Sequence, residues 1–151
     1  MKTTIITIYD PRPKYGNRLQ NYAVQSVLKK FGCQVETIAF EKSHISINKK
    51  TMIKYQIQKL FRFKLPGNTN YWKCDFKKQL TFHRFNKKYI ATKNIFTLDE
   101  AKEIQTDYFV LGSDQVWNPA WYGSCSLKKD LFLLTFARPE QKVCFSPSFG
   151  V

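Results

Sequence analysis

Polar and aromatic side chains follow a short apolar run in the second half of the chain. Residues 109–111 are Phe-Val-Leu, and the glycine after them allows the backbone to turn. An apolar run that ends at a turn is typical of a buried strand in a parallel sheet, and open α/β sheets bind ligands just beyond the carboxyl ends of such strands. The segment therefore predicts a binding site with hydroxyl, carboxylate and amide groups and an indole face for a sugar or another planar group. Its candidate residues are Gly112, Ser113, Asp114, Gln115, Trp117 and Asn118.

A second polar segment opens the first predicted helix. It lacks the GxGxxG and GxxxxGK[ST] patterns, so neither a dinucleotide site nor a P-loop is indicated. The first turn of a helix nevertheless has free backbone N–H groups beside its side chains, and Arg18 could donate a forked pair of hydrogen bonds to a carboxylate or phosphate. The candidate binding residues here are Tyr15, Gly16, Asn17, Arg18, Gln20 and Asn21.

Both segments also have simpler explanations, which the sequence leaves open. Asn17 is a suitable N-cap, and helix capping with outward-facing amides would account for the polar residues at the start of the first helix without a ligand. Ser113 and Asp114 could bond to their own backbone in a turn, with Trp117 packed beneath the loop.

The elements around these segments predict that they meet. Residues 3–9 are apolar and β-branched as in a strand, residues 34–40 form a second such run, and Gly32 suits the position after a helix. Strand, helix and strand within about 40 residues make a βαβ unit with parallel strands. If strand 109–111 belongs to the same sheet, both polar segments lie at one edge. The predicted helix between the two strands has one stripe of residues at three- and four-residue spacing, which are Leu19, Tyr22, Ala23, Ser26, Val27, Lys30 and Phe31.

The rest of the chain continues the alternation of helices and strands. Apolar spacing predicts helices near residues 51–61 and 71–89, a short helix after Thr97, and a final strand at residues 142–145. The apolar run at residues 130–137 fits either a strand or a short helix. We therefore expect an α/β fold, a Rossmann-like parallel sheet with flanking helices, as a single lobe over residues 1–151. The chain stops just after a predicted strand, which suggests that a covering helix is missing.

Positive charge is concentrated in one segment. Between Lys42 and Lys88 there are thirteen Lys or Arg and one acid, which is +12 of the whole chain's +14. We predict a basic helical insertion over residues 42–90. Its interleaved aromatic residues would suit an anionic glycan, a membrane surface or a nucleic acid, although solvated amphipathic helices would have the same composition.

The cysteines and the amino terminus indicate the compartment. The four cysteines, at 33, 74, 125 and 144, form no CxxC pair and have no neighbouring histidine, so we expect no metal site. Dispersed cysteines fit reduced thiols in the cytoplasm. The first residues resemble a strand more than a signal peptide, and no apolar run is long enough to span a membrane.

Three segments resemble the polysaccharide pyruvyl transferase family. Residues 15–23, YGNRLQNYA, are similar to its opening motif, and residues 107–118, DYFVLGSDQVWN, are similar to its central signature. Residues 145–150, FSPSFG, resemble a third motif, with Phe145 and Ser146 in place of the family's tyrosine and alanine. The three occur in the family's order, but the match covers only the front half of the family's length.

The resemblance implies the N-terminal lobe of a GT-B-like transferase with two Rossmann-like lobes. Such an enzyme transfers the enolpyruvyl group of phosphoenolpyruvate, its donor substrate, to a sugar of a cell-surface polysaccharide or a lipid-linked precursor, with no separate cofactor. Asp114 would be the catalytic group that orients or deprotonates the sugar hydroxyl, and the other candidate residues would bind substrate. The arginines and histidine that hold the donor come largely from the second lobe, which is absent from this sequence.

Two functional hypotheses follow. In the first, the chain is a truncated and poorly active pyruvyl transferase in the cytoplasm, at the inner face of the membrane, with a partner chain supplying the second lobe. In the second, it is a non-catalytic basic module that binds an anionic glycan, membrane surface or nucleic acid through residues 42–88. The first hypothesis includes no specific nucleic-acid partner.

Overall fold

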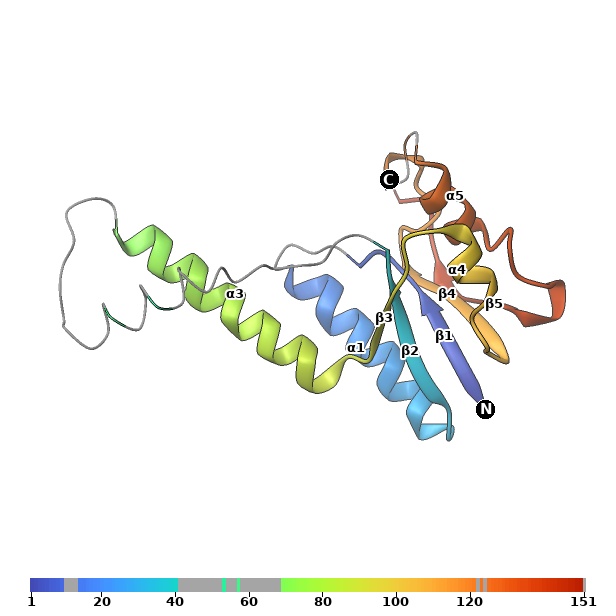
Figure 1. The fold of residues 1–151 in the computed structure, drawn as a ribbon, viewed down its shortest axis with the longest axis horizontal. Helices are drawn as coiled ribbons and strands as arrows, with labels where there is room; N and C mark the ends of the chain where they lie inside the picture. Colours follow the sequence, from blue (N-terminus) through green and yellow to red (C-terminus); the bar gives the residue numbers. More distant parts are fainter. Residues whose placement is uncertain are drawn as a thin grey trace.

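The fold is a five-stranded, all-parallel sheet of order β3-β2-β1-β4-β5 with helices on both faces, as predicted (Figure 1). The computed structural model describes residues 1–9, 14–40, 53, 57, 69–121, 123 and 125–150, with the backbone alone for 69–77. The strands are β1 (Lys2–Ile6), β2 (Gln34–Ala39), β3 (Thr92–Asn94), β4 (Tyr108–Asp114) and β5 (Lys142–Pro147). The helices are α1 (Tyr15–Lys30), α3 (Thr69–Tyr89), α4 (Leu98–Lys102) and α5 (Ser126–Leu133), with 3-10 turns at Pro119–Trp121 and Pro139–Gln141.

Each face of the sheet has its own apolar core, because successive side chains of a strand point to opposite faces. On the face of α1, Val24 packs against Ile5, Val35 and Val110. On the other face, α4 and α5 cover the sheet, and Figure 1 shows these two helices on the opposite side from α1 and α3. The members of this second core include Ile6, Ile38, Phe109, Leu111, Ala101, Leu131 and Phe132.

The buried face of α1 is polar, which differs from the predicted stripe. Arg18, Asn21 and Gln25 are buried with Val24, whereas Leu19 and Val27 of the predicted stripe are exposed. Part of the stripe packs against α3 and not against the sheet, because Tyr22 contacts Phe85 and Tyr89. The helix also begins earlier than expected: its N-cap is Lys14, so Asn17 is not the cap.

Helix α3 packs beside α1 through aromatic rings. Tyr22 of α1 lies edge-on to Phe85 and Tyr89, with ring centroids 5.8 and 5.7 Å apart, and Tyr15 lies 4.6 Å from Phe82. The prediction of a helix at 71–89 is therefore confirmed. Of the predicted helix at 51–61 the structure describes only Ile53 and Ile57, which are both helical and exposed. Much of the basic segment 42–90 lies outside the described residues.

The boundaries of the elements after α3 follow from nearby hydrogen bonds and residue types. Thr97 caps α4 in a reciprocal capping box with Glu100, as the acids near its start favour. The run at 130–137 belongs to a helix, α5, and its following turn, not to a strand. Strand β3 was not predicted, because Thr92–Asn94 is short and its middle residue is a lysine. Among the described residues, no helix has the length and hydropathy required to span a membrane.

Candidate functional site

The candidate site lies at the carboxyl edge of the sheet. Ile6 at the end of β1 is in register with Leu111 of β4, and Gly112 is in register with Phe145 of β5. The loop into α1, the residues after Gly112 and the end of β5 therefore share one edge. The two polar segments predicted from sequence are brought together as expected.

Ser113 is held from two directions at this edge. Its hydroxyl oxygen accepts a 2.7 Å hydrogen bond from Nε2 of Gln20 on α1. Its carbonyl accepts a 3.1 Å hydrogen bond from the Thr7 hydroxyl, just beyond β1. Thr7 was not among the candidate residues predicted from sequence. Its hydroxyl group near the end of a predicted strand could have indicated a place at this edge. These contacts fix the corner after β4 against both β1 and α1.

Asp114 has an unusual backbone conformation with φ of 144°. Its Oδ1 accepts a 2.8 Å hydrogen bond from the Gln115 backbone N–H, and its carbonyl oxygen accepts from the N–H groups of Val116 and Ser148 at 2.8 and 3.0 Å. Non-glycine residues rarely adopt positive φ without a compensating arrangement, and such residues cluster at functional sites. The carboxylate is partly exposed and its orientation is defined by the turn that follows it.

Gly112 is required by the close approach of β5. With φ of +106°, a Cβ at this position would overlap the carbonyl oxygen of Phe145 and lie 3.2 Å from the Pro147 nitrogen. Gly112 therefore contributes to the site through its backbone, because the absence of a side chain lets β5 approach β4 closely. Gly16, in contrast, has nothing within 4 Å of a Cβ position.

The end of β5 completes the site. The Trp117 N–H donates to the Ser148 carbonyl at 3.1 Å, and Asn118 Nδ2 donates to Gln115 Oε1 at 3.3 Å. A Cβ on Gly150 would lie 2.7 Å from Gln115 Oε1, so this glycine lies directly against the amide pair. The predicted residues Gln115 and Asn118 thus contact each other and the third motif.

Asn17 and Arg18 use their polar groups within the protein. The Asn17 amide donates to the Ile8 carbonyl, and Arg18 donates a 2.8 Å hydrogen bond to Asn17 Oδ1. Arg18 is buried with its guanidinium 4.0 Å from the centre of the Tyr9 ring. Burial raises the pKa of Tyr9 above its ordinary value of 10.0, and the Arg18 charge opposes this to a smaller extent. These two residues therefore make contacts inside the protein and connect the start of α1 to the segment after β1.

Asn21 lies in a buried network away from the edge. Its Oδ1 accepts a 2.9 Å hydrogen bond from the Thr37 hydroxyl and a 3.4 Å bond from Gln25 Nε2. Gln25 also donates to Thr37 and to the Ala91 carbonyl, both at 2.8 Å, and accepts from the Ala91 N–H at 3.1 Å. Gln25 was missed from sequence, although an Asn and a Gln four residues apart on a helix would have indicated a shared polar face.

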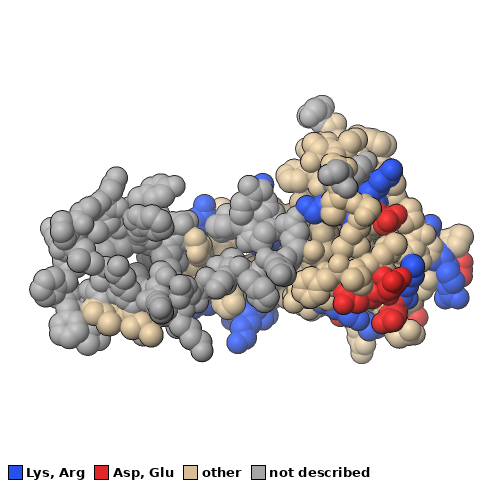
Figure 2. All heavy atoms as spheres, turned by 45° about the horizontal axis from the view of Figure 1, so that its top comes forward, with Lys and Arg blue, Asp and Glu red and all other residues tan. Residues whose placement is uncertain are grey.

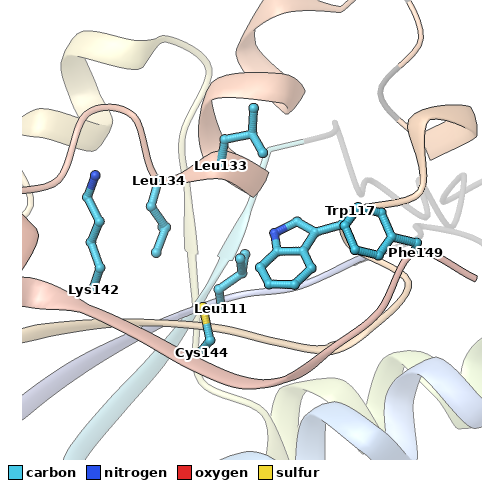
Figure 3. Close-up of a pocket in the computed structure, with 7 residues that line it drawn as sticks. All are labelled: Leu111, Trp117, Leu133, Leu134, Lys142, Cys144 and Phe149. Atoms are coloured by element: carbon cyan, nitrogen blue, oxygen red, sulfur yellow. The ribbon is translucent and has the colours of Figure 1, made fainter.

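Trp117 and Tyr15 lie outside this polar group. Trp117 packs against Phe149, with ring centroids 5.3 Å apart, and both line an apolar pocket of about 310 Å³ on the α5 face (Figure 3). Tyr15 is exposed and contacts Phe82 and the Lys78 ammonium. The remaining pocket residues are Leu111, Leu133, Leu134, Lys142 and Cys144.

The edge thus presents a hydroxyl, a carboxylate and two amides, which is a set suited to hydroxyl-rich ligands. Within the described part of the chain, no group of three or more His, Cys, Asp or Glu could hold a metal ion. No protein-family model, curated protein or solved structure matches this chain.

Proposed function

We propose that this chain is the acceptor-binding lobe of a polysaccharide pyruvyl transferase. The observation that carries the proposal is the meeting of three segments, distant in the chain, at one sheet edge. Gln20 reaches Ser113, and Asp114 accepts a hydrogen bond from Ser148. These three segments are the ones that resemble the family's motifs. Their contact supports the proposal, because the motifs of one active site must lie close together.

The chemistry assigns separate roles to the two lobes. In ketal formation the enol carbon of phosphoenolpyruvate gains a proton, and a first sugar hydroxyl attacks the resulting cationic centre and loses its proton. Phosphate then leaves, and a second hydroxyl of the same sugar attacks the same carbon and loses its proton, which completes the ketal. Asp114 orients or deprotonates the attacking hydroxyl, while Ser113, Gln115 and Asn118 hold neighbouring sugar hydroxyls. The phosphate and carboxylate of the donor require cationic groups. A second lobe from a partner chain supplies these groups in our proposal.

The proposed reaction places the protein in the cytoplasm, at the inner membrane face where a lipid-linked acceptor would be reached. The described cysteines Cys33, Cys125 and Cys144 are free thiols, which supports a reducing compartment.

The test is reconstitution. The 151-residue chain is mixed with the separately expressed second lobe of a known pyruvyl transferase, phosphoenolpyruvate and a panel of lipid-linked and free glycans, and phosphate release is measured. Release that needs both lobes and a particular acceptor supports the proposal. If no acceptor gives release above that of the second lobe alone, the transferase function is rejected.

A second candidate function is binding of an anionic surface or polymer by α3. Residues 78–89 carry Lys78, Arg84, Lys87 and Lys88 without an acid, and all four are exposed. Reversal of charge at Arg84 and Lys87 would abolish retention on heparin and on anionic vesicles, whereas reversal at the similarly exposed Lys29 and Lys30 of α1 would have a smaller effect. Equal losses from both variants would indicate that net charge alone controls retention.

A further inference from the structure

Helix α1 carries an exposed apolar stripe on its outer side. Leu19, Ala23 and Val27 follow one another at four-residue spacing, which places them on one side of the helix. All three are exposed, Leu19 to 55% and Val27 to 43%. Helices at the surface of a globular domain normally bury their apolar side and expose their polar side. In α1 the buried side is mostly polar instead, and apolar side chains face away from the sheet.

Tyrosines line the contact between α1 and α3. Tyr22 of α1 and Tyr89 of α3 pack against each other and are still 39% and 40% exposed. Tyr15, at the start of α1, is also exposed, and its ring contacts Phe82 of α3. A tyrosine side chain has an apolar ring and a polar hydroxyl, which suits it to the boundary between water and a lipid bilayer.

Cations of α3 lie beside these tyrosines. The Lys78 ammonium is 5.5 Å from the centre of the Tyr15 ring, and the Lys88 ammonium is 5.0 Å from the centre of the Tyr89 ring. The other two cations of residues 78–89 are exposed as well. Neither α1 nor residues 78–89 contain an Asp or Glu. The outer surface of the two helices therefore combines an apolar stripe, tyrosines and cations.

Exposed acids are found on the opposite face of the sheet. Asp99 and Glu100 lie on α4, and Glu103 follows that helix. Figure 1 shows α4 on the other side of the sheet from α1 and α3. In the view of Figure 2, the visible Asp and Glu side chains lie on the half of the molecule that contains the sheet. An anionic surface would therefore attract the side of α1 and α3 more strongly than the side of α4.

We propose that the outer surface of α1 and α3 binds the surface of an anionic lipid bilayer. The cations of α3 attract the anionic headgroups, and the apolar stripe of α1 enters the boundary between headgroups and acyl chains. A soluble polyanion would contact the cations and leave the apolar stripe in water, so the stripe favours a bilayer over a glycan or nucleic acid. The proposal rests on the second candidate function, binding through α3, and names its partner.

This orientation also brings the candidate site close to the bilayer. Leu19 precedes Gln20, whose amide donates a hydrogen bond to the Ser113 hydroxyl oxygen. One end of the apolar stripe therefore lies beside the carboxyl edge of the sheet. A sugar carried by a membrane lipid would reach this edge while its lipid stays in the bilayer.

The test is cosedimentation of the full chain with vesicles of equal parts phosphatidylcholine and phosphatidylglycerol. Vesicles of phosphatidylcholine alone and a heparin column serve as comparisons. We expect binding to the mixed vesicles and little binding to phosphatidylcholine alone. The double variant Leu19→Ser, Val27→Ser should bind the mixed vesicles at least about tenfold more weakly, because two apolar side chains no longer enter the bilayer. Its retention on heparin should be unchanged, since no charge is altered.

The matched control is the double variant Phe96→Ser, Leu133→Ser. These two side chains are 52% and 44% exposed, close to the values for Leu19 and Val27. Phe96 precedes α4 and Leu133 ends α5, so both lie away from the proposed membrane surface. We expect no loss of vesicle binding in this variant. Circular dichroism establishes that both double variants fold.

Three results would overturn the proposal. The first is unchanged vesicle binding in the Leu19→Ser, Val27→Ser variant, and the second is an equal loss in the control variant. The third is retention of the natural chain on heparin without binding to mixed vesicles, which would make a soluble polyanion the partner under the second candidate function. Absence of binding to both heparin and vesicles would reject the second candidate function itself, and the proposal with it. None of these measurements depends on the transferase reaction.

Discussion

Gln20 of α1 donates a 2.7 Å hydrogen bond to the hydroxyl oxygen of Ser113, 93 residues away in the chain. This contact joins the first helix to the corner after β4 and lies at the centre of the proposed site. Both residues are partly buried, so the bond is shielded from full competition with water.

We expect Gln20→Ala and Ser113→Ala each to lower the free energy of unfolding by about 1 kcal/mol, and the double variant to lose less than the sum. Urea denaturation of the four proteins measures the coupling. Ser26→Ala removes only an exposed bond to the Tyr22 carbonyl and should change stability by less than about 0.5 kcal/mol. Strictly additive losses at positions 20 and 113 would contradict the contact.

Two glycines of the site should respond oppositely to alanine. Gly112→Ala places a Cβ against the Phe145 carbonyl at a φ of +106° and should lower stability by more than about 3 kcal/mol. Gly16→Ala has open space in the first turn of α1 and should be neutral or stabilising by up to about 1 kcal/mol. Thermal denaturation of both variants checks the contrast, and equal melting temperatures would show that β5 can move away from β4.

The buried amide network beneath α1 should be sensitive to loss of one member. Gln25→Met keeps a similar volume but leaves the Ala91 backbone groups and the Asn21 and Thr37 side chains with fewer partners, so we expect a loss of about 3 kcal/mol. Gln105→Met, at an exposed position, should change stability by less than about 0.5 kcal/mol. Chemical denaturation of the pair gives the comparison.

Asp114→Asn should lower phosphate release in the reconstituted reaction by about 10²-fold or more, because the amide cannot accept the hydroxyl proton. The amide oxygen can still accept the bond from the Gln115 N–H, so folding should be preserved. Asp99→Asn alters an exposed carboxylate on α4 and should leave the rate unchanged. Full activity of Asp114→Asn would remove this residue from the mechanism.

The burial of Tyr9 predicts a loss of folding stability at alkaline pH. Burial raises the pKa of Tyr9 in the folded protein above 10.0, so its stabilising contribution is complete below that pH and is lost as pH rises through the raised value. Unfolding free energies measured between about pH 9 and pH 11 should therefore fall more steeply for the natural chain than for Tyr9→Phe. Parallel curves for the two proteins would show that Tyr9 ionises equally in both states.

The order of most helices and strands could be predicted from local features of the sequence. Gly32 has a φ of +77° directly after the end of α1, as expected for a glycine at that position, and Thr97 caps α4. The β-branched run at the amino terminus and the apolar run before Gly112 became the adjacent strands β1 and β4. The glycine and the cap depend on neighbours within a few residues, so the sequence alone determined them. The shared edge was predicted on the condition that strand 109–111 belongs to the same sheet as the first strand, and the pairing of β1 with β4 meets that condition.

Tertiary structure decided which polar side chains remain at that edge. The sequence could not separate Gln20, which reaches Ser113, from Asn21, one residue further along, which turns into the network with Gln25 and Thr37. Successive residues on a helix point about 100° apart, so their surroundings depend on what packs against each side. The same holds for the face of α1: its apolar stripe was visible, but only the packing of α3 determined that the polar side would face the sheet.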